Sequence, residues 1–424
     1  MTSLCLEDAA WVVPMPGKPV RDEGFSSLEV LEHCSVNLEG DRVASLGSGD
    51  DAETVFDASG CAVVPGFVDC HTHVPFFGWR ADEDAARLSG VRYQDLHRGE
   101  GGIFRSTRML AGASDDEVLD FGDELAAAML SKGTTTFEMK SGYGLSVEAE
   151  IRQLRLAARL SERVPQRTTA TCLAAHAVPP GKSQGEWVGE AATELLPTAA
   201  REELASACDL YVESIAFALE HGARLAETAA ELGLRMRVHA DQLEDSQAGA
   251  FAARWGFASA DHLNHTSLDA VADLAASDTV AVLLPGATFT LRQAAKPPAR
   301  SLIEAGAVVA LGSDLNPGTS PIHSMPFVIT LACRTYGLRP LEAVAAATVN
   351  AAFALDLHEE VGSLVPGRRA DAVVLGGPVD EICYRPDRDP VVAVVCGGKL
   401  VHVAPGAEGR VLRRTTTPSG GRAP

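Results

Sequence analysis

The middle of the chain alternates short apolar runs with longer stretches rich in Ala, Leu and Glu. A short apolar run bounded by turn residues predicts a strand, and apolar positions three and four apart predict a helix. We expect eight strands in this region, at residues 67–71, 134–138, 168–174, 209–213, 235–239, 257–261, 280–284 and 308–312. Helices are expected between most of these strands or after the last, for example at 116–131, 147–160, 215–232 and 341–352.

Strands that alternate with helices indicate an α/β fold with a parallel sheet, and eight such units fit a (β/α)8 barrel. A doubly wound open sheet is the competing architecture. Polar residues of the kind that bind ligands gather at the ends of six of the eight predicted strands. A closed barrel would bring these ends together at one face, so the TIM-like (β/α)8 barrel is the predicted fold.

Both ends of the chain show short strand-like runs separated by turn residues, at 10–13, 35–38, 42–46 and 61–64 and again at 370–375, 391–396 and 399–403. Two such segments can pair into one small domain. We therefore predict a composite β-sandwich domain from residues 1–65 and 360–404, with the barrel at 66–359. Residues 405–424 are rich in Gly, Thr, Arg and Pro, and we expect a flexible tail there.

The net charge of the chain limits the partners that it can bind. Its 424 residues carry 57 acidic and 36 basic side chains, a formal net charge of -21. This field repels nucleic acid and anionic membranes, and we expect neither as a partner.

Residues 1–16 lack the basic region of a secretory signal, and no apolar run approaches the roughly 18 residues that span a bilayer. The nine cysteines form no CxxC pair, which favours a reducing, cytoplasmic setting.

The segment at 66–73 reads GFVDCHTH and carries the strongest chemical signal. Successive side chains of a strand point to opposite faces, so His71 and His73 share one face and can bind one metal ion. In isolation such a pair is more often a chance feature of a surface strand. Three further residues at other predicted strand ends favour a metal site: His239, His262 and Asp314. Each alone would also fit a buried polar group or a helix cap, but together they offer ligands suited to zinc, iron or manganese.

The sequence PGFVDCHTH at 65–73, the later His and Asp residues and the flanking β-segments resemble the amidohydrolase superfamily. Five finer motifs resemble its imidazolonepropionase family: KSGYG at 140–144, AHAVPP at 175–180, HADQL at 239–243, SADHL at 259–263 and DLNPGTS at 314–320. This resemblance implies hydrolytic ring opening of 4-imidazolone-5-propanoate to N-formimidoyl-L-glutamate in histidine degradation. The substrate would be a small anionic heterocycle, and a homodimer is a family-level expectation.

The resemblance also implies one divalent or trivalent metal ion per subunit, zinc or iron. Its ligands would be His71, His73, His239 and Asp314. Substrate contacts carry over to Arg80, Tyr143, His176, Gln242, Asn316, Gly318 and Thr319.

The chemistry of these residue types agrees with that assignment. A bound metal makes water nucleophilic at neutral pH, and Asp314 can take its proton and pass it to the departing ring nitrogen. His262, outside the four ligands, is placed to stabilise the developing oxyanion. The planar fork of Arg80 matches a propionate carboxylate, although a solvated surface arginine is the simpler interpretation of that residue alone.

Three alternatives remain open from the sequence. A deaminase of the same fold would place a Glu where this chain has Gln242, and the neutral amide cannot shuttle protons, so that activity is disfavoured. Gln242 is instead expected to join Asp314 and His262 as a catalytic residue by orienting a ring nitrogen through a hydrogen bond. A two-metal hydrolase of the dihydroorotase or hydantoinase kind would need a carboxylated Lys in the fourth strand to bridge its metals, and the segment 209–213 contains no Lys. A carboxylated Lys140 is less favoured. Glu213 could be an extra metal ligand or could support a histidine. A catalytically silent, metal-free scaffold is the remaining possibility.

Two positions depart from the family pattern. Trp79 stands just before Arg80, where small residues are usual, and Leu110-Ala111 replaces a Thr-Arg pair. A bulky Trp79 would reshape the carboxylate pocket. These departures keep a related imidazolone or another cyclic amide open as the substrate.

Overall fold

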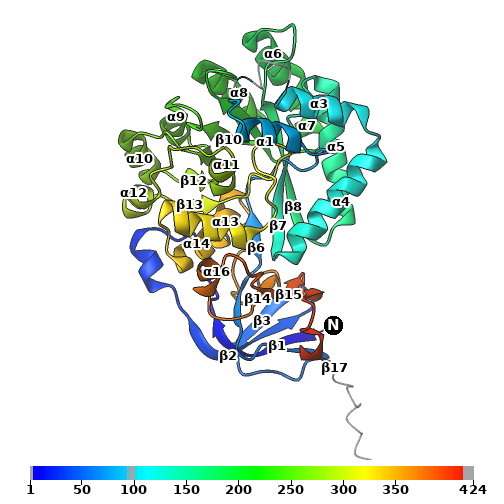
Figure 1. Cartoon of the computed structure of the whole chain (residues 1–424), viewed down its shortest axis with the longest axis vertical. Helices are drawn as coiled ribbons and strands as arrows, with labels where there is room; N and C mark the ends of the chain where they lie inside the picture. Colours follow the sequence, from blue (N-terminus) through cyan, green and yellow to red (C-terminus); the bar gives the residue numbers. More distant parts are fainter. Residues whose placement is uncertain (1–2, 93–94, 96–100, 414–424) are drawn as a thin grey trace, which may run out of the picture.

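The computed structural model describes residues 3–92, 95 and 101–413. A barrel of strands and helices lies above a second sheet in the view of Figure 1. The barrel strands are β6 (Phe67–Asp69), β7 (Thr134–Lys140), β8 (Arg167–Ala175), β9 (Ala207–Val212), β10 (Arg235–Ala240), β11 (Ser259–His262), β12 (Val280–Leu283) and β13 (Val309–Leu311). Each of the eight predicted strands is present, with its bounds shifted by a few residues at most.

The barrel strands are parallel and are hydrogen-bonded in chain order from β6 to β13. The first and last strands meet through a parallel bridge between Thr72 and Leu315. Two backbone hydrogen bonds support it, from His73 N to Leu315 O and from Asp314 N to His71 O, each 2.9 Å long. These contacts bring the ring close to closure, so the predicted barrel is confirmed over the open sheet.

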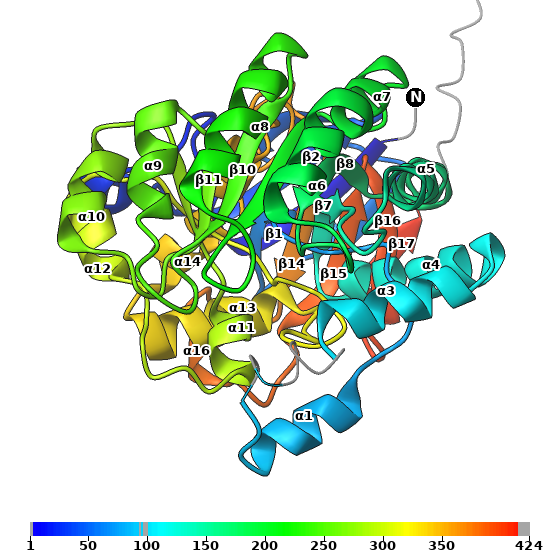
Figure 2. The same cartoon turned by 90° about the horizontal axis from the view of Figure 1, so that it is seen from above.

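Helices surround the ring of strands on its outer side (Figure 2). The predicted helix at 116–131 is α4 (Asp115–Ser131), which begins with a capping box between Ser114 and Glu117. The helix at 147–160 is α5 (Val147–Arg163), with Ser146 as its N-cap. The other helices around the barrel are α1 (Ala81–Leu88), α3 (Ile103–Gly112), α6 (Gln184–Glu190), α7 (Leu196–Arg201), α9 (Ala248–Trp255), α10 (Leu268–Ala275), α11 (Pro285–Thr290), α12 (Ala299–Glu304) and α13 (Met325–Leu331).

Two predicted helices have different bounds. The helix expected at 215–232 is α8 (Leu219–Glu231), because a turn in which Ala216 N donates to Glu213 O occupies its first residues. The helix expected at 341–352 is two helices, α14 (Pro340–Ala346) and α15 (Val349–Ala354). Thr348 breaks it with φ of -132° and ψ of -97°, and this turn lets α15 pack against β6, β12 and β13.

The second sheet combines both ends of the described chain. Its strands are β1 (Ser3–Val12), β2 (Leu31–Glu39), β3 (Arg42–Gly47), β4 (Thr54–Asp57), β5 (Ala62–Pro65), β14 (Ala372–Leu375), β15 (Val391–Cys396), β16 (Lys399–Val403) and β17 (Val411–Arg413). β14, from the late segment, pairs antiparallel with β5, from the early one. The division of the chain into domains at 65/66 and 359/360 stays a prediction.

The predicted tail at 405–424 differs from what the structure shows. Its first part includes β17, which pairs antiparallel with β4 through Val411–Phe56, Leu412–Val55 and Arg413–Thr54. A Leu and a Val in an otherwise polar stretch are enough to add an edge strand when a partner strand is available. Residues 414–424 lie outside the described part.

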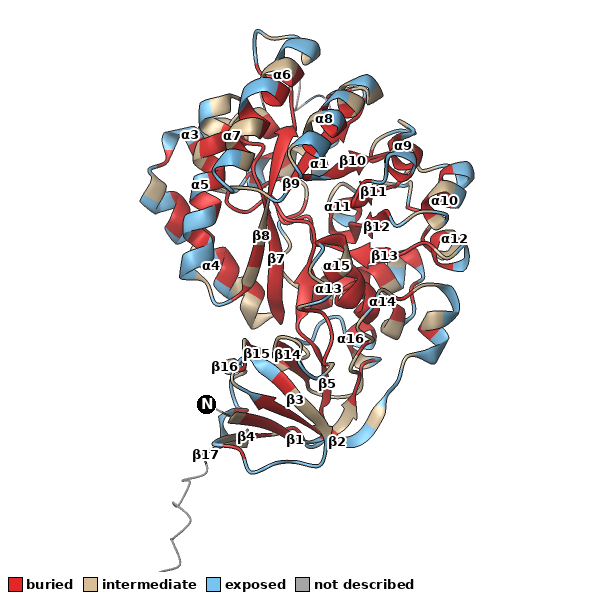
Figure 3. Ribbon diagram, turned by 180° about the vertical axis from the view of Figure 1, so that it is seen from behind, coloured by how far each residue is buried: buried red, intermediate tan, exposed pale blue. Residues whose placement is uncertain are grey.

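The largest core lies between the barrel strands and their covering helices, where buried residues dominate (Figure 3). On β10, Met236, Val238 and Ala240 belong to this core, and the alternate residues Arg237 and His239 are buried on the other face. The inside of the barrel therefore carries charged and metal-binding side chains. None of the described helices is long and apolar enough to cross a membrane.

Candidate active site

Four histidines and one aspartate meet at the carboxyl ends of the barrel strands. His71 and His73 follow β6, His239 lies in β10, His262 ends β11 and Asp314 follows β13. All five are buried. The Asp314 carboxylate lies 3.5 Å from His71 Nε2 and 3.2 Å from His73 Nε2, and the Nε2 atoms of His73 and His239 are 3.5 Å apart.

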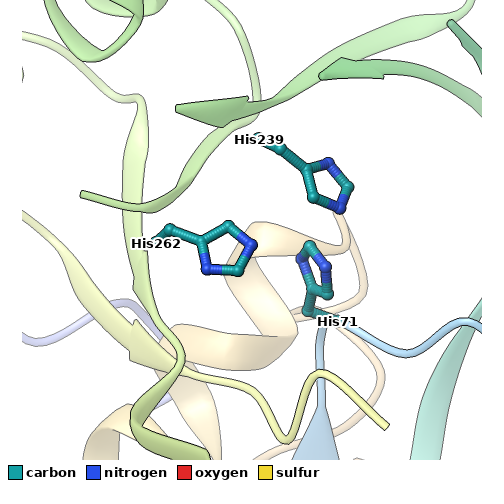
Figure 4. Close-up of side chains that lie close together, drawn as sticks. All are labelled: His71, His239 and His262. Atoms are coloured by element: carbon teal, nitrogen blue, oxygen red, sulfur yellow. The ribbon is translucent and has the colours of Figure 1, made fainter. Parts of the chain in front are cut away.

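Two overlapping groups of these residues could hold a metal ion. One is His71, His239 and His262, whose rings lie close together in Figure 4, and the other is His71, His73 and Asp314. Within each group the ligand atoms lie within 4.8 Å of one another. His71 Nε2 is buried with no hydrogen-bond partner, which is costly for a polar atom unless a ligand meets it. The donor set fits a metal that takes nitrogen and oxygen ligands, such as zinc or iron.

Two carboxylates fix the orientation of the histidine rings. Asp261 Oδ2 lies 2.5 Å from His71 Nδ1, and Asp209 Oδ1 lies 3.2 Å from His239 Nδ1. An Nδ1–H that donates to a carboxylate leaves Nε2 with its lone pair free for a metal. Asp209 also accepts a hydrogen bond from Lys140 Nζ at 2.7 Å.

A layer of buried charges lies below the histidines inside the barrel. Lys140 Nζ is 2.8 Å from Glu138 Oε2, and Arg237 Nε is 3.2 Å from Glu138 Oε1. Burial lowers the pKa of Lys140, but Asp209 and Glu138 more than offset this and raise it above the ordinary value. Lys140 is therefore a charged partner of two carboxylates, and this is the opposite of the neutral amine that carboxylation requires.

Burial sets the protonation of the histidines. It lowers the pKa of His71 and His73 well below the ordinary value, and it lowers that of His262 to about 3. For His239, burial acts in the same direction, but the charge of Asp209 outweighs it and raises the pKa. Neutral imidazole is the form that binds metal.

The backbone is strained at two of these positions. His262 has φ of 79° and Asp314 has φ of 55°, in the left-handed region that residues other than glycine rarely adopt. Such strain costs on the order of 1–3 kcal/mol and is concentrated at functional sites. The fold thus holds both side chains toward the cavity at some expense in stability.

A cavity opens beside the histidines and collects most of the residues predicted to contact substrate. It is lined by His73, Arg80, Ile103, Tyr143, His176, Tyr211, His239, Gln242, His262, Asp314, Asn316 and Thr319. Gly318 contributes in another way, because it lies directly under the guanidinium group of Arg80. A Cβ at Gly318 would stand 1.8 Å from Arg80 Nη2.

Arg80 is only 3% exposed, and its Nε and Nη1 atoms have no hydrogen-bond partner. Its nearest acidic neighbour is Glu83, with Oε2 3.4 Å from Arg80 Nη1. Glu83 is itself engaged by the backbone N–H of Gly102. The guanidinium group therefore keeps donors available to an anion in the cavity.

Asn316 holds the loop after β13 in place. Its Oδ1 accepts from the backbone N–H groups of Gly318 and Thr319, and its Nδ2 donates to Asp314 O and to Thr319 Oγ1. Asn316 lines the cavity, but its side chain is already committed to the loop that carries Asp314 and Gly318.

Three residues complete the wall opposite that loop. His176 Nδ1 lies 3.0 Å from Gly142 O, and its ring stacks on His73 with centroids 5.2 Å apart. Tyr143 follows β7, with its ring 5.3 Å from that of His176. Gln242 also lines the cavity, and its backbone oxygen accepts a hydrogen bond from Gln293 Nε2.

Two lining residues were not predicted from the sequence. Tyr211 lies on β9, two residues after Asp209 and therefore on the same face, so the strand alternation carried a signal for it. Ile103 begins α3, and no local pattern marks it.

The two departures from the family pattern lie away from the cavity lining of the described residues. Trp79 is 39% exposed and packs edge-on against Phe76 and Phe121, at 5.3 Å and 5.8 Å between ring centroids. Leu110 lies on the buried face of α3, and Ala111, next to it, is exposed. The ring of Trp79 turns toward α4 and is not among the residues that line the cavity.

Glu213 lies near the site without joining either group of metal-type residues. Its Oε1 accepts a hydrogen bond from Leu243 N at 2.8 Å. Burial raises its pKa to about 7. Glu213 therefore supports the loop that carries Gln242.

The fold and this cluster define a metal-dependent hydrolase, in which a barrel presents histidine and aspartate side chains at its carboxyl face. The amidohydrolase family model matches residues 62–401. The imidazolonepropionase of Symbiobacterium thermophilum is 42% identical and covers 97% of this chain and 99% of its own length. The imidazolonepropionase of Rubrobacter xylanophilus is also 42% identical, over 94% and 99%. The chain belongs to the amidohydrolase family and, within it, to the imidazolonepropionases.

Solved structures show the same fold at low sequence identity. A triazine hydrolase variant superposes with a TM-score of 0.73 at 16% identity, covering 95% of both chains. A mutant of atrazine chlorohydrolase from Arthrobacter aurescens, complexed with zinc and atraton, gives 0.73 at 14% identity, covering 94% of this chain and 95% of that one. These likenesses show the fold alone; the family resemblance of the sequence motifs is confirmed by the family model and the 42% identical relatives.

Proposed function

We propose that this chain hydrolyses 4-imidazolone-5-propanoate to N-formimidoyl-L-glutamate. The observation that carries the proposal is the buried Arg80, which lines the same cavity as His73, His239 and Asp314 and whose Nε donor has no hydrogen-bond partner. A small ring with a propionate arm can place its carboxylate at Arg80 and its ring carbonyl at the metal-type residues. The names of the relatives support the same reaction.

The proposed ligands of one zinc or iron ion are His71, His73, His239 and Asp314. The ion supplies Lewis-acid activation of a water molecule at neutral pH. Asp314 accepts the proton of the attacking water and returns it to the ring nitrogen as the C–N bond breaks. His262 stabilises the negative charge that develops on the carbonyl oxygen.

The remaining residues bind and orient the substrate in this proposal. Arg80 pairs with the propionate, and Tyr143, His176 and Gln242 hydrogen-bond the ring. Thr319, with the backbone at Gly318, borders the propionate arm. Asn316 contributes mainly by fixing that loop.

We further propose a homodimer in a reducing, cytoplasmic setting. The nine cysteines are all free thiols, in agreement with that setting. Light scattering during size-exclusion chromatography measures the oligomeric state directly.

The substrate is tested by parallel turnover assays of the metal-loaded protein. 4-Imidazolone-5-propanoate is compared with hydantoin, dihydroorotate and an amino-substituted heterocycle at equal concentrations. We expect turnover of the first alone. Turnover of another compound without turnover of the first would refute the assignment while leaving the family intact.

A further inference from the structure

Two thiols far apart in the sequence touch at the junction between the barrel and the second sheet. Cys333 lies in a short helical segment, η3 (Ala332–Tyr336), which continues α13. Cys383 lies in α16 (Glu381–Tyr384), between β14 and β15, and α16 sits at the junction in Figures 1 and 3. Their sulfur atoms are 2.9 Å apart. The proposed hydrolysis uses neither residue.

Two side chains near Cys333 donate hydrogen bonds to the backbone around Cys383 and hold the two segments together. Arg334, next to Cys333, donates from Nε and Nη2 to Cys383 O at 3.1 Å and 2.8 Å. Thr330, one turn earlier, donates from Oγ1 to Ile382 O at 2.8 Å. A disulfide bond of about 2.05 Å therefore needs a movement of only about 1 Å between the two segments.

The two cysteines line a common cavity. It has a volume of about 450 Å³, and its lining also includes Arg334 and Tyr384. Tyr384 is 74% exposed, and Cys333 is partly exposed. Cys383 is buried at 6% exposure, so an oxidant would reach it through this cavity, whereas Cys70, Cys172 and Cys208 are buried in the barrel wall and line none of the cavities described.

The environment also favours ionisation at one of the two positions. The hydrogen bond with Cys333 lowers the pKa of Cys383, and the charge of Arg334 acts in the same direction against the effect of burial. In contrast, burial raises the pKa of Cys70 and Cys172 well above the ordinary thiol value. The thiolate is the reactive form, so oxidation is directed to this pair.

We propose that Cys333 and Cys383 are a reversible thiol–disulfide site that responds to peroxides. The Cys383 thiolate attacks the peroxide O–O bond and forms a sulfenic acid, while the other oxygen leaves and is protonated to water or an alcohol. The Cys333 sulfur then attacks the sulfenic sulfur, and water leaves as the S–S bond forms. Two thiols are oxidised, one peroxide is reduced, and a dithiol reductant restores the pair.

The bond would join a barrel helix to the connection between two strands of the second sheet. η3 continues α13, which follows the loop that carries Asp314, and α16 follows β14. A crosslink that closes the chain between positions 333 and 383 limits the unfolded state. The oxidised protein should therefore melt at a higher temperature than the reduced protein.

The test treats the reduced full-length protein, with its metal bound, with a slight excess of hydrogen peroxide. Digestion without reductant, followed by mass spectrometry, should recover the peptides of Cys333 and Cys383 joined. The intact mass should fall by about 2 Da, and dithiothreitol should reverse both changes. The melting temperature should rise on oxidation and return on reduction.

Cys383→Ser should lose the crosslink and the thermal shift, and Cys34→Ser, which removes a buried thiol in β2, should keep both. Recovery of the two peptides unlinked, with the thiols either intact or oxidised to sulfinic acid, would overturn the proposal. Peptide mapping of the wild-type protein decides this even if a variant fails to fold.

Discussion

Individual carboxylates determine how the histidines present their metal-binding atoms. Asp261 bonds His71 and Asp209 bonds His239, each at Nδ1. The histidines themselves could be predicted, because each lies at the end of an apolar run. Their aspartate partners could not be assigned this role, since a linear pattern does not show which side chains meet across a barrel. The pairing of Asp261 with His71 depends on the closure of the ring, and that of Asp209 with His239 depends on the register of the neighbouring strands β9 and β10.

The roles proposed for His239 and His262 can be separated by metal content. His239→Ala removes a proposed ligand and should yield protein with little bound metal. His262→Asn removes only the group proposed to stabilise the oxyanion, so metal should remain near one equivalent while kcat falls by about 10²–10³. Elemental analysis and steady-state kinetics measure the two effects. Loss of metal from His262→Asn as complete as from His239→Ala would make His262 a ligand.

Arg80 is expected to act on substrate binding. Removing one partner of a buried charge pair costs on the order of 2–5 kcal/mol, so Arg80→Ala should lower kcat/KM at least about 30-fold, chiefly through KM. Metal content should stay at the wild-type level. Arg159→Ala, an exposed arginine on α5, is the matched control. An unchanged KM for Arg80→Ala would show that the propionate is held elsewhere.

At the level of elements, the loop between β13 and α13 organises the site. It carries Asp314, its conformation is fixed by Asn316, and its Gly318 leaves room for Arg80. The DLNPGTS motif allowed the residues of this loop to be predicted. The packing of Gly318 against Arg80 could not be predicted, because it brings together residues that follow the first and the last barrel strands.

Gly318→Ala tests this packing. Its Cβ would stand 1.8 Å from Arg80 Nη2, so the guanidinium group must move. We expect KM to rise toward that of Arg80→Ala while the bound metal stays constant. Gly185→Ala, where nothing lies within 4 Å of the added Cβ, should be silent in the same assays. Wild-type kinetics for Gly318→Ala would show that Arg80 has other productive positions.

Other elements show where sequence patterns lose accuracy. The apolar pattern at 341–352 is continuous and predicts one helix, but Thr348 turns the chain so that α15 covers β6, β12 and β13. The strands β4 and β17 were not predicted, because they are short; they pair with each other at an edge of the second sheet. In both cases tertiary packing overrides a weak local preference.

For the whole molecule, the net charge of -21 and the proposed anionic substrate oppose each other. Attraction of the substrate must therefore be local, from Arg80 and a bound cation in a cavity shielded from solvent.

The molecule also depends on contacts between distant parts of the chain. β5 precedes the barrel in the sequence and β14 follows it, and the two strands pair. Asp371 lies at this junction and accepts a hydrogen bond from Gly397 N.

Asp371 should make stability depend on pH. Burial raises its pKa to about 6, and Arg369 only partly offsets this. The folded protein therefore binds a proton more tightly than the unfolded chain, so stability should fall as the pH rises from about 4 to about 6. The contribution is on the order of 1–3 kcal/mol.

Urea titrations between pH 4 and pH 7 measure this effect. Asp371→Asn should flatten the dependence, and Asp116→Asn, at an exposed position, should leave it unchanged. An equal slope in wild type and Asp371→Asn would contradict the assigned titration.

The central claim is that a metal held by the histidine–aspartate cluster drives opening of the imidazolone ring. The most direct measurement is the rate of N-formimidoyl-L-glutamate formation from 4-imidazolone-5-propanoate in protein stripped by a chelator and reloaded stepwise with zinc or iron. We predict no turnover in the stripped protein and a rate that rises in proportion to bound metal, up to about one equivalent per chain. Full activity without metal, or no activity at full loading with either metal, would contradict the account.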